Sequence, residues 1–113
     1  MMYVDFKAGN NDYKLRLATR NVVGLEKAIG CNPLSIFGAG DKIPPVTQMV
    51  TILWYSMQKY HHGITLEKAY DIFDEYLEDG KSMTDFIPVI IEIFKVSGLM
   101  HNDSQKEDTE EKN

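Results

Sequence analysis

Several features that would assign a protein to a class are scarce or missing in this sequence. It has a single cysteine, Cys31, among 113 residues, so neither an internal disulfide nor a cysteine-based metal cage can form. No apolar run is long enough to span a bilayer, because Glu92 and Lys95 interrupt the longest one, residues 86–99. The first residues include an early acid and no apolar signal core, which predicts a cytoplasmic protein without a membrane anchor.

Positive charge is also scarce. The chain has 12 Lys and Arg against 17 Asp and Glu, and its formal net charge is −5. The basic residues are scattered and form no stripe, although a nucleic-acid-binding protein normally presents a basic face. We therefore expect neither nucleic acid nor membrane as a partner.

What the chain does have is the composition of one globular domain. Apolar residues make up 43% of it and charged residues 26%, and its length suits a single core. From His101 onward the sequence has no apolar residue, so ordering that segment would not be repaid by burial. We predict a helical domain over residues 1–100 and a disordered acidic tail over residues 101–113.

Alternation at the N-terminus predicts a β-hairpin. Apolar residues at 3, 4 and 6 and at 13, 15 and 17 flank residues 8–12, which contain the Gly and Asn that a tight turn favours. Beyond it the periodicity predicts about four helices, and therefore a mainly α fold, a small helical bundle. Thr19, Thr65 and Ser82 are the expected N-caps, Gly30 ends the first helix, and Pro44 and Pro45 open the second.

Each later helix has a predicted apolar face. In residues 66–78, an apolar stripe (Leu66, Ala69, Tyr70, Phe73, Leu77) opposes an acidic one (Glu67, Asp71, Asp74, Glu75, Glu78). The last helix carries Met83, Phe86, Ile87, Ile90, Ile91 and Phe94. Pro88 lies within its first two turns and is expected to kink it or delay its start. Residues 31–44 form a loop with a short helical turn.

Four features invite a chemical interpretation, and each has a simpler one. His61 and His62 are adjacent, so on a helix their side chains diverge and do not share a metal. Residues 38–42 contain glycines and a lysine but lack the spacing of a phosphate-binding loop. The acids of residues 67–78 fit a solvated helix face or a docking surface for a basic partner, and Cys31 has no histidine near it in sequence. We expect no catalytic, cofactor or metal site.

The aromatic residues Trp54 and Tyr55 leave the main apolar arc of their helix. Two interpretations stay open: they complete a core that is buried on several sides, or they belong to a protein–protein surface, where Trp and Tyr are enriched.

The order of these segments resembles the tail assembly chaperone family of long-tailed bacteriophages, in its gene-transfer-agent-like branch. The similarity runs through four stretches in succession: residues 13–19, 23–30, 52–61 and 64–69. In that order, the four stretches resemble the following features of the family: a strand leading into a capped helix, the first helix ending in glycine, a Leu-Trp helix ending near histidine, and the Thr-Leu-Glu opening of the third helix.

The resemblance implies a non-enzymatic protein of the host cytoplasm that binds the tape measure protein, helps tail tube subunits assemble around it, and is absent from the mature virion. We expect Trp54, Tyr55, Phe86, Ile90 and Phe94 to contribute to the partner-binding surface or to self-association in a homo-oligomer. The alternative is a head–tail connector or another structural protein of a prophage, which would stay in the finished particle.

Overall fold

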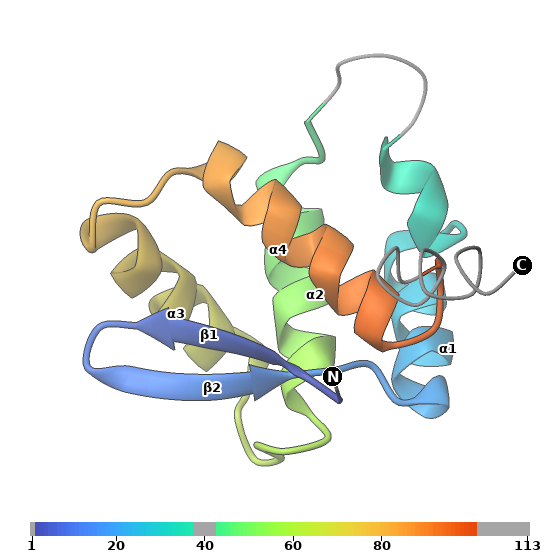
Figure 1. Cartoon of the computed structure of the whole chain (residues 1–113), viewed down its shortest axis with the longest axis horizontal. Helices are drawn as coiled ribbons and strands as arrows, with labels where there is room; N and C mark the ends of the chain where they lie inside the picture. The colour runs from blue at the N-terminus through green and yellow to red at the C-terminus, as the bar shows by residue number, and fades with distance from the viewer. Residues whose placement is uncertain (1, 38–42, 102–113) are drawn as a thin grey trace, which may run out of the picture.

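The computed structural model describes residues 2–37 and 43–101. Its elements, in chain order, are β1 (Val4–Ala8), β2 (Asn11–Leu15), α1 (Thr19–Ile29), the 3-10 helix η1 (Pro33–Phe37), α2 (Val46–Met57), α3 (Leu66–Glu78) and α4 (Met83–Val96). Four α-helices and an N-terminal hairpin within these residues confirm the predicted fold class (Figure 1). Most of the predicted acidic tail (residues 102–113) and the glycine-containing segment 38–42 lie outside the described residues.

The N-terminal strands pair antiparallel, with Phe6 opposite Tyr13 and Ala8 opposite Asn11. Gly9 makes the reversal with a φ of 61°, a conformation that glycine adopts without steric cost. Phe6, Ala8, Tyr13 and Leu15 point inward and are buried. A lone two-stranded hairpin is marginal in water, so this one depends on the helices that it covers.

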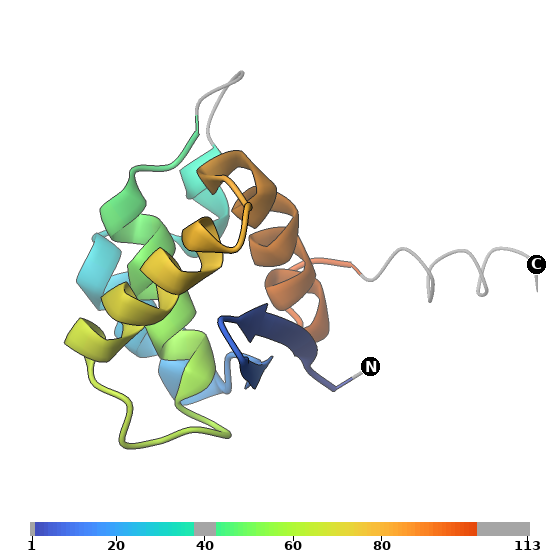
Figure 2. The ribbon, with the colours of Figure 1, turned by 90° about the vertical axis from the view of Figure 1, so that its left-hand side faces the viewer.

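The central element is α2, which explains why its sequence is apolar on most sides. It contacts α1, α3, α4 and β2. Figures 1 and 2 show α1 and α3 flanking it, while α4 and the hairpin lie over one side. Six of its twelve residues are buried, among them Met49, Ile52 and Leu53.

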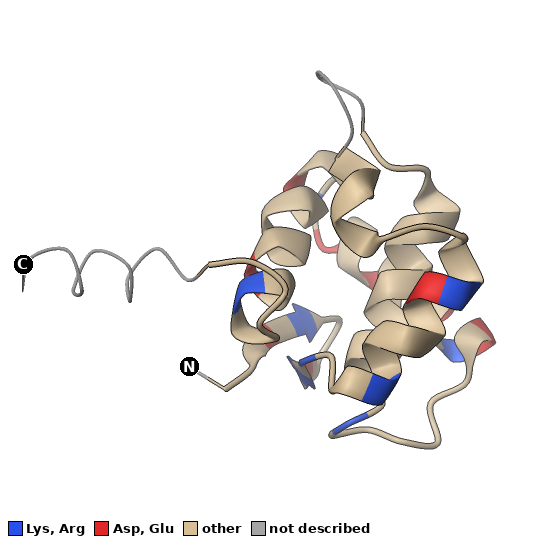
Figure 3. Ribbon diagram, turned by 90° about the vertical axis from the view of Figure 1, so that its right-hand side faces the viewer, with Lys and Arg blue, Asp and Glu red and all other residues tan. Residues whose placement is uncertain are grey.

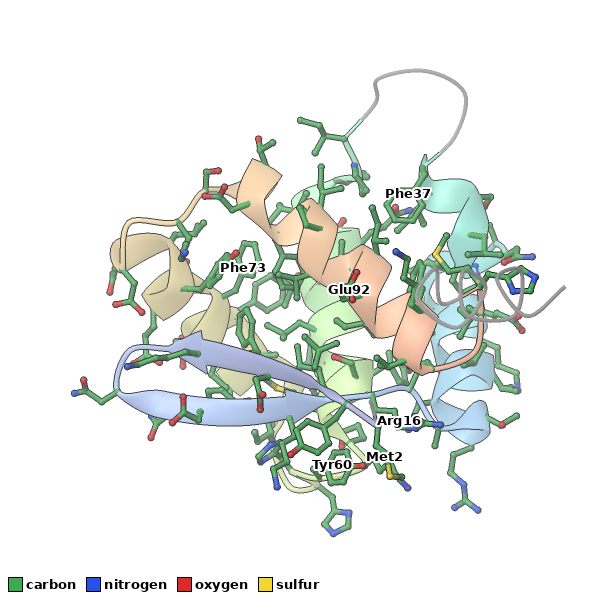
Figure 4. The ribbon with its side chains drawn as sticks, viewed as in Figure 1. Met2, Arg16, Phe37, Tyr60, Phe73 and Glu92 are labelled. Atoms are coloured by element: carbon green, nitrogen blue, oxygen red, sulfur yellow. The ribbon has the colours of Figure 1, made fainter. Side chains whose placement is uncertain are left out.

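An aromatic cluster joins the hairpin, α3 and α4. The ring centroids of Phe73 and Phe86 are 5.2 Å apart in an edge-on arrangement, and Phe6 lies 4.9 Å from Tyr76. Figure 4 shows Phe73 on the side of α3 that faces α4. Such rings bury large apolar areas and also prefer these edge-on and tilted geometries, so the cluster anchors three elements together.

The hairpin and the residues after it also form hydrogen bonds with the C-terminal ends of α3 and α4 and with the loop after α2. The hydrogen bonds are Gly9 N–H to Asp79 Oδ2 (2.7 Å), Lys14 N–H to His61 Nε2 (2.9 Å), Leu17 N–H to Ser97 Oγ (2.9 Å) and Arg16 Nη1 to the carbonyl of Val96 (2.7 Å). Arg16 also donates to the carbonyl of Met2, which lies beside it in Figure 4. The positive guanidinium suits the negative end of the α4 dipole.

Helix ends follow the sequence prediction at most positions. The hydroxyl of Thr65 accepts the N–H of Lys68, and Ser82 and Asp85 form a reciprocal capping box. Gly30 ends α1 with a φ of 75°. Pro88 neither delays nor ends α4, which begins at Met83 and runs through it.

Two boundary predictions were wrong. Thr19 is the first residue of α1, the N-cap is Ala18, and Asn21 Oδ1 accepts the Ala18 N–H. The side-chain hydrogen bond at this helix start thus comes from Asn21, the third residue of α1, and it binds the N–H of the N-cap residue, not an N–H of the first turn. Pro45 is the N-cap of α2 and stands just outside the helix, which ends at Met57, earlier than the predicted end near His61.

Among the residues that the structure describes, none of the helices combines the length and the apolar character that crossing a membrane requires.

Candidate interaction surface

Titratable side chains of the described residues do not converge. No group of three or more His, Cys, Asp or Glu within residues 2–37 and 43–101 is arranged to hold a metal ion. A surface hollow of about 240 Å³ is lined by the consecutive residues Gly98 to His101, so it brings no groups together from different elements. Cys31 is half-buried and packs against the core.

The groups with perturbed acidity have structural partners. Burial, followed by the charge of Lys14, lowers the pKa of His61, whose Nε2 accepts the Lys14 N–H. Burial raises the pKa of Tyr76, with a smaller contribution from Asp85. Hydrogen bonds from Ser82 lower the pKa of Asp85. The capping box therefore accounts for the shift of Asp85, burial at the contact of β2 with the loop after α2 for that of His61, and burial in the aromatic cluster for that of Tyr76.

Burial also raises the pKa of Tyr13, and the charge of Glu75 adds to the effect. The ring of Tyr13 meets that of His61 edge-on, with centroids 5.4 Å apart. Tyr13 thus belongs to the same contact between the hairpin and the end of α2.

Three of the five predicted partner-binding residues are not on a surface. Phe86, Ile90 and Phe94 are each 0% exposed and belong to the hydrophobic core. The expectation that the apolar side of the last helix is available to a partner is thereby corrected. Because α4 lies over α2 and the hairpin, that side packs within the molecule.

Trp54 and Tyr55 are half-buried residues of α2 that pack against the core. The Trp54 indole N–H donates to the carbonyl of Ile64 at 2.7 Å, just before α3. The ring centroids of Trp54 and Tyr55 are 4.7 Å apart. The pair therefore contributes to the packing between helices and keeps part of its aromatic area exposed, while its place in a protein–protein surface stays a prediction.

Tyr55 reaches α1 at a position where a side chain is missing. An ideal Cβ on Gly24 would lie 2.6 Å from Tyr55 Cε1, which is closer than real Cβ contacts allow. Gly24 lies in the middle of α1, where glycine normally weakens a helix. The ring of Tyr55, which packs against Gly24, explains why a glycine occupies this position of α1.

Only part of the predicted apolar stripe of α3 is buried. Leu66 and Tyr70 are each 39% exposed, although they lie one turn apart on the stripe. The buried face of α3 is instead formed by Ala69, Ile72, Phe73 and Tyr76. An apolar stripe wider than the buried face is the signal that could have identified this exposed pair.

The acidic residues of α3 lie beside that exposed pair. Glu67, Asp71, Asp74 and Glu78 are all exposed, and Lys68 is the only basic residue of the helix. Within the described part of the chain, no α3 acid forms an ion pair, whereas Lys95 pairs with Glu92 on α4 at 3.7 Å. Figure 3 shows basic positions on the hairpin, the start of α1 and the loop after α2.

The comparisons with known proteins add a family. No curated protein and no solved structure gives a significant match. A model described as a family of unknown function, DUF6096, matches residues 4–113 and so covers nearly the whole chain. The chain belongs to the DUF6096 family.

Proposed function

We propose that this chain is a non-enzymatic tail assembly chaperone of a phage or prophage, of the gene-transfer-agent-like branch, and that it binds the tape measure protein. The observation that carries the proposal is the exposed apolar area on α2 and α3, formed by Trp54, Tyr55, Leu66 and Tyr70. Tryptophan and tyrosine are the residues most enriched at the energetic centres of protein interfaces. The order of segments that resembles the chaperone family supports the same function.

The mechanism follows from the chemistry of the partner. A tape measure protein carries long apolar helices that are exposed until the tail tube covers them, and such surfaces promote aggregation. A chaperone that lays half-exposed aromatic side chains against these helices removes apolar area from water. It acts in the host cytoplasm, hands the tape measure protein to the tail tube protein, and leaves before the virion is complete.

A binding role also agrees with the arrangement of titratable groups. His61, Tyr76 and Asp85 contribute to packing or capping, and general acid–base chemistry needs groups that meet at one substrate. We therefore propose no reaction and no cofactor for this chain.

The test is co-expression of the tagged chain with the tape measure protein encoded in its gene neighbourhood. We expect the two proteins to purify together, and the tape measure protein to stay soluble only when the chain is present. An equal yield of soluble tape measure protein without the chain would contradict the proposal. Detection of the chain as a stoichiometric part of purified particles would favour the connector alternative instead.

Substitution at the aromatic pair locates the surface. Trp54→Ala and Tyr55→Ala should weaken recovery of the tape measure protein about tenfold or more. Both residues are half-buried, so circular dichroism must first show that the variants fold. Leu34→Ser is the matched control, because Leu34 is an exposed leucine on η1, away from this surface. Equal recovery with all three variants would remove the aromatic pair from the site.

A further inference from the structure

We propose that the outer face of α3, defined by Leu66, Tyr70, Glu67, Asp71, Asp74 and Glu78, is a docking site for a basic amphipathic helix of the partner protein. The inference rests on the proposed function to the extent that it specifies the partner's chemistry. Its physical basis is a pair of parallel stripes on one helix.

The two stripes have the same spacing. Apolar residues recur at 66, 70, 73 and 77, and acidic residues at 67, 71, 74 and 78, in steps of four, three and four. That spacing keeps each stripe along one line of the helix. The one-residue offset turns the acidic stripe by about 100° from the apolar one, and Glu67 and Asp74, three and four residues from Tyr70, are its neighbours on the helix surface. Phe73 is buried, but Leu66 and Tyr70 are each 39% exposed. The apolar stripe is therefore open at the N-terminal half of α3 and has an acidic border.

The negative charge of this face is a local property of α3. The helix has five acidic residues and one lysine, whereas the rest of the described chain has eight basic and six acidic residues. No ion pair within the described residues neutralises any of the five. The charge is thus concentrated on the helix that also exposes the apolar pair.

The acids are placed where they oppose the stability of the isolated helix. Glu67 and Asp71, and likewise Asp74 and Glu78, are like charges four residues apart, which repel across one turn. Glu78 ends α3, and the last turn of the helix has no basic residue to balance the negative end of its dipole. A cationic partner would relieve both effects on binding.

These features select one kind of occupant. Nucleic acids and anionic lipid surfaces are excluded by their own negative charge. An α3 of 13 residues presents a stripe about 20 Å long, which matches three to four turns of a second helix. A helix with apolar residues at spacings of three and four, bordered by Lys or Arg, would cover Leu66 and Tyr70 and pair with the acids, as in a coiled coil.

The probe is a fluorescently labelled peptide of about three heptads, with Leu at the a and d positions and Lys at e and g; its control has Glu in place of Lys. Fluorescence anisotropy should show that the Lys peptide binds and the Glu peptide does not, and added salt should weaken the binding of the Lys peptide. Leu66→Gln with Tyr70→Gln should weaken binding at least tenfold, because glutamine keeps the helix propensity and removes the apolar contact.

The electrostatic part has a matched control. The variant Glu67→Gln, Asp71→Asn, Glu78→Gln should also weaken binding at least tenfold. The variant Asp5→Asn, Asp12→Asn, Glu26→Gln removes the same amount of charge from exposed residues outside α3 and should leave binding within twofold. Equal weakening by the two triple variants would overturn the proposal, since only the net charge would then matter.

Three further outcomes test the occupant of this face and separate the inference from the proposed function. If size-exclusion chromatography shows a dimer that the Leu66→Gln, Tyr70→Gln variant loses, the face binds a second copy and the inference is wrong. If the tape measure protein co-purifies equally with the wild-type chain and both α3 variants, the proposed function stands and the inference fails. If the Lys peptide binds through α3 but the tape measure protein does not co-purify, the inference stands and the proposed function fails.

Discussion

His61 shows how much one side chain can decide locally. Its Nε2 accepts a hydrogen bond from the Lys14 N–H at 2.9 Å, which is possible only while that nitrogen carries no proton. Its ring also packs edge-on against Tyr13, with centroids 5.4 Å apart. The sequence suggested a residue at a helix end, but the partners lie 47 and 48 positions away in the chain, where no local pattern could indicate them.

This contact predicts a pH dependence of stability. The pKa of His61 is lowered from its ordinary value of 6.5, first by burial and then by Lys14, so the unfolded chain binds this proton more readily than the folded chain does. The stabilising contribution of the neutral ring is present above pH 6.5 and is lost as the pH falls through the lowered folded pKa. His61→Gln should therefore lose less stability than the wild type between about pH 7.5 and pH 5.5 in urea titrations.

The neighbouring histidine supplies the control. His62 is exposed, so His62→Gln should keep the wild-type slope of stability against pH. Parallel curves for His61→Gln and the wild type would show that the hydrogen bond to Lys14 does not contribute to the pH dependence.

Gly24 carries a second prediction at this scale. Alanine in place of a glycine inside a helix usually stabilises it by about 0.5–1 kcal/mol. Here the new Cβ would meet Tyr55 Cε1 at 2.6 Å, so Gly24→Ala should lower the free energy of unfolding by about 1–2 kcal/mol. In a Tyr55→Ala background the same substitution should become stabilising. Urea unfolding of the wild type, the two single variants and the double variant measures the effect of Gly24→Ala with and without the Tyr55 ring. Stabilisation by Gly24→Ala in both backgrounds would refute the packing argument.

At the scale of elements, the helix starts separate what local sequence determines from what it does not. Thr65 and Ser82 are caps as predicted, because each is followed at once by a complete helical pattern. Thr19 looked equivalent, but Ala18 is the cap and Asn21 supplies the oxygen. Where two neighbouring residues could begin a helix, the side chain that reaches a free N–H decides which of them is the N-cap. The apolar periodicity cannot distinguish them, because it is the same for a helix that starts one residue earlier or later.

These two threonines make a matched pair for a stability test. Thr65→Ala removes the hydroxyl that accepts the Lys68 N–H and should cost about 1 kcal/mol. Thr19→Ala replaces an exposed residue inside the first turn and should change stability by less than about 0.5 kcal/mol. A larger loss for Thr19→Ala than for Thr65→Ala, measured by chemical denaturation, would reverse the cap assignment.

The junction between β2 and α4 predicts a further loss. Arg16 donates to the carbonyl of Val96, the last residue of α4, and to that of Met2, which precedes β1, so Arg16→Met should reduce stability by about 1–2 kcal/mol. Arg20→Met, at an exposed position on α1, should stay within about 0.5 kcal/mol of the wild type. Equal effects of the two substitutions in thermal unfolding would show that the junction contributes little.

For α3 and α4, the sequence predicted the helices better than it predicted the faces that they bury. The bounds of α3 follow from its cap and its terminal Asp79 and Gly80, but Leu66 and Tyr70 are exposed and Tyr76 is buried. Periodicity gives the direction of an apolar stripe, whereas the buried flank depends on where the hairpin and α4 lie against the helix. Phe86 and Phe94 were assigned to a docking surface for the same reason.

At the scale of the whole molecule, the fully buried core residues and the apolar residues that we propose for binding form two different sets. The buried rings of Phe6, Phe73, Tyr76 and Phe86 join the hairpin, α3 and α4 into one core. Trp54, Tyr55, Leu66 and Tyr70 remain partly exposed and are the residues that we propose for binding. The sequence predicted Trp54 and Tyr55, because an aromatic residue outside the main apolar arc can be recognised on a helical wheel. It did not predict Leu66 and Tyr70, because periodicity does not show that the apolar stripe of α3 is wider than its buried face.

The most direct measurement of the central claim is a ¹H–¹⁵N spectrum of the labelled chain, titrated with the tape measure segment that co-purifies with it. Trp54 is the single tryptophan, so its indole N–H gives one assignable signal next to the proposed surface. The account predicts that this signal and the backbone signals of Leu66, Tyr70 and Asp71 shift or broaden first. Shifts confined to the hairpin and α1, with the Trp54 indole unchanged, would contradict it.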